Sequence, residues 1–211
     1  MYLGTSAQQF PGRDVLELTY RETGDGRPLL LLHGFLGSGW QWLDHGPAAS
    51  LAELGYRVIL ANLRAHGDSA HPHNPASYPL DVLADDGLAL LEWLDLDDYD
   101  LGGYSLGARV VLRMLARGAQ PAHAIVAGQG HDAVTGTINP SDRNHRVLTA
   151  LANGESLDPG SADADLAYWV GQLGGDPQAL RHVLDTHVAT PDATLRQILT
   201  PALVAVGNQD T

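Results

Sequence analysis

Hydrophobic positions along the chain follow two periods in turn, which predicts strands separated by helices. Val15–Tyr20 alternates apolar and polar residues, as an edge strand does. Leu29–Leu32 is an unbroken run of four leucines, a pattern typical of a buried central strand. Further strands are predicted over Tyr56–Ala61, Asp98–Leu101, Ala122–Ala127 and Ala202–Val206, and helices over Trp40–Leu54, Leu80–Leu94 and Leu106–Arg117. This alternation predicts an α/β fold class, a doubly wound and mostly parallel sheet with helices on both faces.

The pattern changes between Gly128 and about Thr200, where helix signals occur without a good strand. Ser161 precedes an apolar helical stretch, and Asp176-Pro177 and Thr190-Pro191 each place a capping side chain before a proline. The sequence therefore predicts an α/β core formed by residues 1–128 and 200–211, with residues 129–199 inserted as a helical cap.

A tight turn at residues 103–107 carries the main candidate for chemistry. Gly103-Tyr104-Ser105-Leu106-Gly107 matches G-x-S-x-G, in which a serine sits on a sharp strand-to-helix turn with its hydroxyl in a cleft. So sharp a turn leaves no room for a Cβ two positions either side of the serine. For these five residues alone, a glycine-rich turn that happens to contain a serine is an equal alternative. The predicted strand before the motif and helix after it favour a nucleophile at Ser105.

Several other residues are candidates for binding a substrate. Arg109 lies one helical turn after Ser105, where it would either meet an anionic substrate or lie on the helix surface. Trp40 and Trp169 are candidate pocket walls, although ordinary packing is the commoner role of such residues.

Cofactors and metals are not expected. The glycine-rich loop at residues 33–39 does not match G-x-G-x-x-G, and no acidic residue follows at the distance of a ribose-binding group. His66, Asp68, His71 and His73 lie close in sequence, but their spacing does not fit a known metal motif.

Composition excludes some classes of partner. The 211 residues carry a formal net charge of −13, with 25 acidic residues against 12 basic ones, all of them arginine. This balance argues against nucleic-acid and anionic-membrane partners. With no cysteine, the chain has no disulfide or thiolate site. We see no secretory signal and no apolar run of the roughly 20 residues that a membrane span needs, so we expect a cytoplasmic protein.

Four segments together give the chain a resemblance to the α/β-hydrolase superfamily over nearly its whole length. Leu32-His33-Gly34-Phe35 is similar to the family's oxyanion loop. Residues 62–69 are similar to its D-x-R-G-H-G-x-S loop, with Asn62 for aspartate and Ala65 for glycine. The third segment is the serine turn, and the fourth, residues 203–210, resembles the strand that delivers the catalytic acid. The resemblance implies Ser105 as nucleophile, Asp210 as acid, and the backbone N–H groups of Phe35 and Leu106 as the oxyanion hole.

The family's catalytic histidine lies on a loop after one further strand, whereas this sequence ends one residue after Asp210. We therefore expect a longer chain, or a partner that supplies the histidine. His131 is the one substitute base worth considering and is also a candidate pocket residue. Asp132 is a second, less favoured acid. The strand at residues 202–206 also lacks a predicted neighbour on one side, so self-association through that edge is expected.

The resemblance implies a serine hydrolase that cleaves a small carboxylic ester or lactone through an acyl-serine. The serine turn and the loop at residues 33–39 are also similar to a menaquinone-pathway synthase on the same fold, in which the arginine after the turn would bind a carboxylate. A non-catalytic ligand-binding protein of the same fold is the third possibility. Epoxide hydrolases and dehalogenases are disfavoured, because their nucleophile is an aspartate and Ser105 stands at that position.

Overall fold

The run of four leucines forms the middle of a sheet that is buried on both faces. In the computed structural model, which describes residues 6–44, 46–137 and 142–207, β3 (Arg27–Leu32) lies between β4 (Tyr56–Asn62) and β5 (Asp100–Tyr104). Successive strand residues point to opposite faces. Accordingly, Leu30 and Leu32 belong to one buried cluster, while Leu29 and Leu31 belong to another. The prediction of a central strand here is confirmed.

The described residues form a seven-stranded sheet in the order β1-β2-β4-β3-β5-β6-β7. The first two strands, β1 (Gln8–Pro11) and β2 (Glu17–Thr23), run antiparallel to their neighbours, and the remaining pairs are parallel. The predicted α/β fold with a mostly parallel sheet is confirmed. The start predicted for β2 at Val15 is wrong, because Asp14 and Val15 adopt left-handed φ values of 59° and 60° in a short 3-10 turn, η1 (Arg13–Val15).

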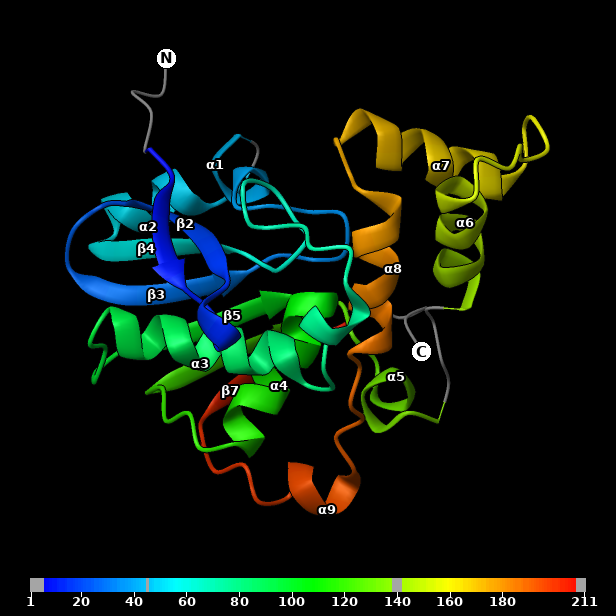
Figure 1. Ribbon diagram of the computed structural model, residues 1–211. Coiled ribbons are helices and arrows are strands. Elements are labelled where there is room, and N and C mark those ends of the chain that lie inside the picture. The colour runs from blue at the N-terminus through cyan, green and yellow to red at the C-terminus, as the bar shows by residue number, and fades with distance from the viewer. Residues whose placement is uncertain (1–5, 45, 138–141, 208–211) are drawn as a thin grey trace.

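Helices cover both faces of the sheet (Figure 1). One face, with Leu30 and Leu32, packs on α3 (Val82–Trp93) and α4 (Leu106–Ala116). The other face packs on α1 (Trp40–Asp44) and α2 (Ala48–Glu53), preceding β4. The single helix predicted over residues 40–54 is therefore wrong. Pro47, which lacks an N–H and clashes with the preceding turn, separates the two short helices.

The described part of the segment from residue 129 to 199 contains helices joined by turns and no strand. Two of the three predicted caps are confirmed: Ser161 Oγ accepts from Ala164 N at 3.1 Å, and Asp176 Oδ1 accepts from Gln178 N at 3.0 Å. The cap predicted at Thr190 is wrong, because the last helix begins at Asp192 after Pro191. The helices are α5 (His131–Thr135), α6 (Asp142–Ala152), α7 (Ala162–Gln172), α8 (Pro177–Asp185) and α9 (Asp192–Leu195).

Three of these helices form a small core of their own. Leu148 of α6, Val170 of α7 and Leu180 of α8 are buried together, and Phe35 and Leu36 of the loop after β3 pack against them. In Figure 1, α6 and α7 stand away from the sheet, with α8 between them and the sheet. The loop after β3 thus connects the sheet to this helical group, which we call the α6–α8 lobe. Its role as a substrate cap stays a prediction.

The final described strand lies at the edge of the sheet. β7 (Ala202–Ala205) pairs with β6 (His123–Ala127), and Leu203 and Val204 remain 63% and 61% exposed. Self-association through this edge stays a prediction. In the described part of the chain, none of the helices has the length and apolar character that a membrane crossing requires.

Candidate functional site

Ser105 occupies a strained turn between β5 and α4. Its backbone has φ 52° and ψ −111°, a positive φ that side-chain-bearing residues rarely adopt. Ser105 N donates to Ala127 O at 2.8 Å, which joins the turn to the end of β6. Ser105 O accepts from Arg109 N at 3.2 Å and so starts the helix. The half-buried side chain therefore lies at the carboxyl edge of the parallel strands, beside the first turn of α4.

The two glycines that flank the serine are required by close backbone contacts. A Cβ on Gly103 would lie 2.3 Å from Gly107 O, and one on Gly107 would lie 2.3 Å from Leu32 O. Both distances are far below a permitted contact, so the explanation given for the motif from the sequence is confirmed. The same contacts press α4 against the end of β3 and fix the direction in which Ser105 points.

Gly107→Ala is expected to lower the free energy of unfolding by about 1–3 kcal/mol or more, because the methyl group meets backbone that has little room to move. Gly171→Ala is the matched control. This α7 glycine has open space around its Cβ position and an ordinary φ, so alanine is expected to stabilise by up to about 1 kcal/mol. Urea unfolding of both variants measures the difference, and equal effects would contradict this account of the turn.

The loop after β3 lies directly against the serine turn. A Cβ on Gly34 would lie 3.4 Å from Ser105 Cβ, so Phe35 follows at a position close to the hydroxyl. Within the described chain, no protein acceptor is seen for the backbone N–H of Phe35. The first turn of α4, beginning at Leu106, also presents N–H groups that have no acceptor within the helix. These are the two donors predicted for the oxyanion hole, and that role stays a prediction.

Two buried histidines hold this loop in place rather than supplying a base. His33 Nδ1 donates to Gly34 O at 2.8 Å, and His33 Nε2 accepts from Leu63 N at 3.0 Å. His66 Nδ1 donates to Arg64 O at 2.9 Å, and its ring lies 5.0 Å from that of His33. Burial lowers the pKa of His33 to about 4, and burial with the neighbouring His33 lowers the pKa of His66 to about 3. Both rings are therefore neutral near pH 7.

Asn62, which stands where the resembled family has aspartate, uses both ends of its amide. Its Oδ1 accepts from Gly39 N at 2.8 Å, and its Nδ2 donates to Thr19 Oγ1 at 2.8 Å. The amide therefore connects the loop after β3 to β2. The departure from the family's loop is thus accommodated by local hydrogen bonding.

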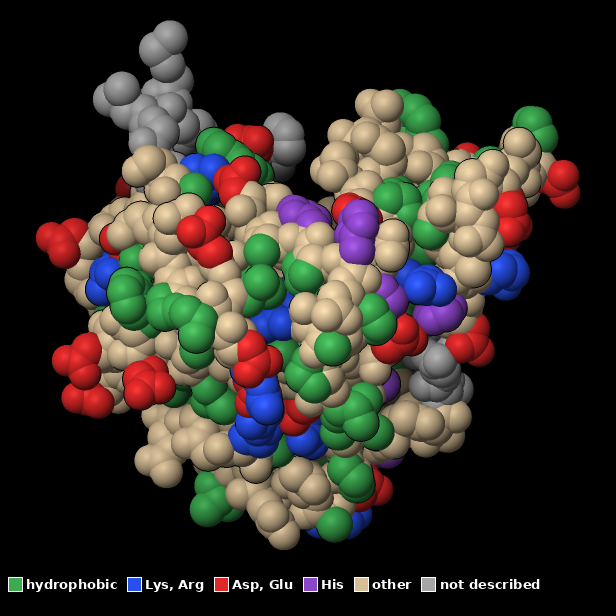
Figure 2. All heavy atoms as spheres, viewed as in Figure 1, with side chains coloured by type: hydrophobic (Ala, Val, Ile, Leu, Met, Phe, Trp, Pro, Cys, Tyr) green, Lys and Arg blue, Asp and Glu red, His purple; other side chains and the backbone are tan. Residues whose placement is uncertain are grey.

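A large cavity lies between the core and the α6–α8 lobe, and Figure 2 shows the surface hollowed there. We call it the Trp40 cavity. Its volume of about 650 Å³ is in the range of small-molecule sites. Ser105 is not itself among the lining residues, but its neighbours Tyr104 and Gly34 are. The lining comes from residues 34–38, Trp40, Gln41, Asp44, residues 65–68, His71, Tyr104, residues 173–175 and Leu180.

The structure brings only some of the predicted binding residues to this cavity. Trp40 lines it, and Arg21 stacks 4.4 Å from the centre of the Trp40 ring. Arg109 lies instead in a second cavity, between α3, α4 and residues 183–188. Of the two alternatives for Arg109, a position on the helix surface is wrong, because the residue is only 9% exposed and its Nη1 lies 3.5 Å from His187 Nδ1. Binding of an anionic substrate by Arg109 stays a prediction.

His131 and Trp169 lie among the described residues that line neither cavity. His131 is exposed, and its Nε2 lies 2.7 Å from Asp192 Oδ1 and its Nδ1 3.5 Å from Asp132 Oδ1. This pairing, with Asp192 first, raises its pKa above the ordinary value and directs the ring to the surface, away from Ser105. Trp169 is 55% exposed and stacks edge-on with Tyr168.

Gln129 is the residue near Ser105 that sequence reasoning missed. Its Nε2 donates to Gly128 O at 2.9 Å and lies 3.5 Å from Ser105 Oγ, a long hydrogen bond. Its position directly after β6 was the available signal, since residues after parallel strands gather at one edge of the sheet. No histidine nitrogen of the described residues lies within hydrogen-bond distance of Ser105 Oγ. Asp210, the expected acid, lies outside the described residues, and its role stays a prediction.

The loop after β4 carries three histidines, His66, His71 and His73. Over residues 6–44, 46–137 and 142–207, no group of three or more histidine, aspartate or glutamate side chains is arranged to hold a metal ion. His66 Nδ1 donates to the Arg64 carbonyl oxygen, and His73 Nε2 lies 2.6 Å from Asp176 Oδ2 at the start of α8.

Comparison with known proteins agrees with this fold. Over 145 residues the chain is 32% identical to the non-heme chloroperoxidase CPO-A1 of Kitasatospora aureofaciens, a match that covers 67% of this chain and 51% of that protein. The chain thus spans about half the length of this curated relative. The esterase RhEst1 from Rhodococcus sp. ECU1013 superposes with a TM-score of 0.70 at 27% identity, over 97% of this chain and 82% of the esterase.

The bromoperoxidase from Bacillus anthracis superposes with a TM-score of 0.67 at 25% identity, over 96% of this chain and 82% of that chain. The epoxide hydrolase CorEH superposes with a TM-score of 0.68 at 19% identity, over 96% of this chain and 82% of the epoxide hydrolase. At this low identity the likeness supports the fold alone. The sequence profile of the alpha/beta hydrolase fold matches residues 27–152, more than half of the chain. With its sheet order and its serine turn, this chain belongs to the α/β-hydrolase fold family.

Proposed function

We propose that the protein is a serine hydrolase that cleaves a small carboxylic ester or lactone through an acyl-serine at Ser105. The observation that carries this proposal is the strained turn at Ser105, which positive φ and two obligatory glycines hold at the edge of the sheet. Strain of this kind persists only where the surrounding structure fixes it, and it is concentrated at functional sites. The resemblance of the chain to a solved esterase supports the same reaction class.

The proposed reaction uses the groups around this turn. The Ser105 hydroxyl attacks the substrate carbonyl carbon and gives up its proton to a base, and the carbonyl oxygen takes the negative charge. The N–H groups of Phe35 and Leu106 are proposed to stabilise that charge, a device worth about 3 kcal/mol per donor in hydrolases. The alcohol then leaves, and water releases the acyl group. Asp210 is proposed as the acid of this site. The base is proposed to be a histidine, and none of the histidines in the described residues lies within hydrogen-bond distance of Ser105 Oγ.

The Trp40 cavity is the proposed place for the acyl or alcohol group. Phe35, Leu36 and Trp40 give it apolar walls, and its lining includes Gly34 and Tyr104, which are next to Ser105. These features favour a small and mostly apolar ester over a charged one. A carboxylate-bearing substrate, as in the synthase alternative, would require Arg109, which faces a different cavity.

Covalent labelling with a fluorophosphonate tests the proposal. We expect the wild-type protein to be labelled at Ser105 and Ser105→Ala to lose the label completely, because the probe reacts only with an activated hydroxyl. Ser50→Ala is the matched control, since Ser50 is exposed on α2, and it is expected to be labelled as the wild type is. An unlabelled but correctly folded wild-type protein would support the non-catalytic ligand-binding alternative. Because two relatives are named as haloperoxidases, halogenation with peroxide is a second activity to assay.

A further inference from the structure

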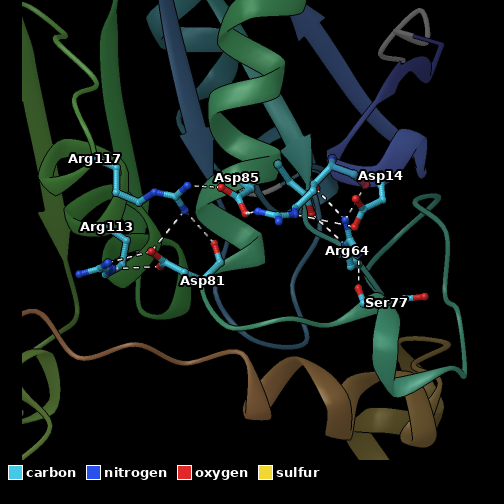
Figure 3. A network of polar contacts seen from close by, with 9 residues as sticks. Asp14, Arg64, Ser77, Asp81, Asp85, Arg113 and Arg117 are labelled. Carbon is cyan, nitrogen blue, oxygen red and sulfur yellow. Dashed lines mark hydrogen bonds and ion pairs between the residues drawn. The ribbon is translucent and has the colours of Figure 1, made fainter.

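Three arginines follow one another along the same side of α4, at positions 109, 113 and 117. Arg113 donates to both carboxylate oxygens of Asp81, at 3.0 and 2.8 Å. Arg117 pairs with Asp81 at 3.3 Å and with Asp85. Figure 3 shows the two guanidinium groups reaching these carboxylates at the start of α3. Two of the three cations on this helix are therefore neutralised by neighbours.

Arg109 is the most buried of the three and has no such partner. Its side chain is only 9% exposed, and no carboxylate of the described residues pairs with it. The guanidinium Nε is buried without a hydrogen-bond acceptor. Among the described residues, its one hydrogen-bond contact is with the ring of His187, whose Nδ1 lies 3.5 Å from Arg109 Nη1. Buried ions in proteins are normally paired, because an unpaired one loses its hydration without compensation.

The unpaired guanidinium faces a cavity rather than packed protein. This Arg109 cavity has a volume of about 30 Å³, enough for about two water molecules. Leu106, which directly follows Ser105, is part of its wall, with Arg113, His187 and the Asp81 carboxylate, which already pairs with Arg113, on other sides. The lining carries two guanidinium groups, of Arg109 and Arg113, against one carboxylate, that of Asp81, so its net charge is positive. Burial, and to a lesser extent the two arginines, lowers the pKa of His187 to about 4 although Asp81 acts in the opposite direction. The cavity is thus small, positively charged and distinct from the Trp40 cavity.

We propose that the Arg109 cavity binds a small monovalent anion, of the size of chloride or formate, held by Arg109 beside His187. Arg113 and Arg117 are neutralised by Asp81 and Asp85, and the anion supplies the corresponding negative charge for Arg109. It also connects α4 to the segment after α8, since Arg109 belongs to the first and His187 to the second. This site is independent of the proposed reaction at Ser105 and would exist in a non-catalytic protein.

Line broadening of the ³⁵Cl NMR signal tests the site directly. We expect the wild-type protein to broaden the chloride signal and formate to reverse that broadening by competition. Arg109→Gln is expected to lose about 10- to 100-fold in chloride affinity, as the loss of a charged hydrogen-bond donor predicts. Arg109→Lys, which keeps the charge, should retain part of it. Arg196→Gln is the control, because Arg196 is exposed, pairs with Asp192 and is not among the residues that line the cavity.

Thermal unfolding gives a second readout. Sodium formate is raised from 1 to 100 mM in place of sodium gluconate, an anion too large for the cavity, at constant ionic strength. We expect the Tm of the wild type to rise by on the order of 5 °C where formate reaches about 100 times its Kd, and the Tm of Arg109→Gln to stay constant. At low formate the Tm of Arg109→Gln should be no lower than that of the wild type, because the variant lacks the buried, uncompensated charge of Arg109.

Three results would overturn the proposal. One is chloride broadening that is equal in Arg109→Gln and Arg196→Gln. Another is a Tm of Arg109→Gln that is lowered equally at every formate concentration, which would make Arg109 a packing residue. The third is a protein that binds neither free anion but hydrolyses carboxylate-bearing esters with a lower KM than neutral ones, and loses this preference in Arg109→Gln. That result would assign the cation to the substrate.

Discussion

Asp86→Ala is expected to lower the free energy of unfolding by about 3–5 kcal/mol, a large part of the 5–15 kcal/mol typical of a domain. Asp86 forms a two-point ion pair with Arg64, from Nε to Oδ2 at 3.0 Å and from Nη2 to Oδ1 at 2.8 Å. The side chains are only 4% and 1% exposed. Removing the carboxylate leaves a buried guanidinium that retains only the backbone carbonyls of Ser77 and Arg13 as acceptors. It also removes the acceptor for Arg13 N, at 2.8 Å.

The matched control for this prediction is Asp98→Ala. Asp98 pairs with Arg27 at 2.8 Å, but its side chain is 78% exposed, so we expect a much smaller loss than in Asp86→Ala. Urea unfolding followed by circular dichroism gives both values. If the two variants lost similar free energy, the buried pair would not be a principal contact between α3 and the loop after β4.

Stability is expected to fall by about 4 kcal/mol when the pH drops from 7 to 5. The pKa values of His33 and His66 are lowered to about 4 and about 3 in the folded protein, against 6.5 for a free imidazole. At pH 5 the unfolded chain therefore binds two protons that the folded protein does not bind. The stabilisation by the neutral rings is complete above pH 6.5 and is lost as the pH falls toward 4 and then 3. His187, also lowered to about 4, acts in the same direction.

Two measurements check this prediction. The slope of unfolding free energy against pH between 6 and 5 should be smaller in His66→Gln than in the wild type, by about 1.4 kcal/mol per pH unit. In NMR spectra of the folded protein, the Hε1 signals of His33 and His66 should not titrate above pH 5. A titration of either ring near pH 6.5 would show that it is hydrated, and that the loop after β3 is less tightly held than the hydrogen bonds indicate.

The strands that sequence analysis placed well are those whose pattern reflects burial alone. Leu29–Leu32 packs against helices on both faces of the sheet, so its continuous hydrophobicity is explained by a central strand. The order of strands and helices then allows only a few sheet topologies. The same holds for the serine turn, where a positive φ and two contacts of 2.3 Å leave no alternative to glycine at positions 103 and 107. One of these contacts lies within the turn, between Gly103 and Gly107, and the other joins Gly107 to Leu32 of β3, but each is visible in the sequence as a glycine.

Helix ends were less predictable. Pro47 interrupts a stretch whose apolar spacing continues through it, and Thr190 resembles a cap but is followed by Pro191 in an extended conformation before the helix starts. In both places the backbone restriction of a proline decided where the helix begins, and the hydrophobic periodicity of the sequence carries no information about that restriction.

The sequence by itself determined the fold family, the serine turn and the loop that faces it, because close backbone contacts require glycine and buried strands require continuous hydrophobicity, and both are visible in the residue types. Only the tertiary structure decided which polar side chains meet. It placed Trp40 at the large cavity, turned His131 toward Asp192, put Gln129 beside Ser105, and gave carboxylates to Arg113 and Arg117 but not to Arg109. The physical reason is that the residue type of a charged or hydrogen-bonding group does not show which partner lies close to it in the fold, because that partner is often tens of residues away in the chain.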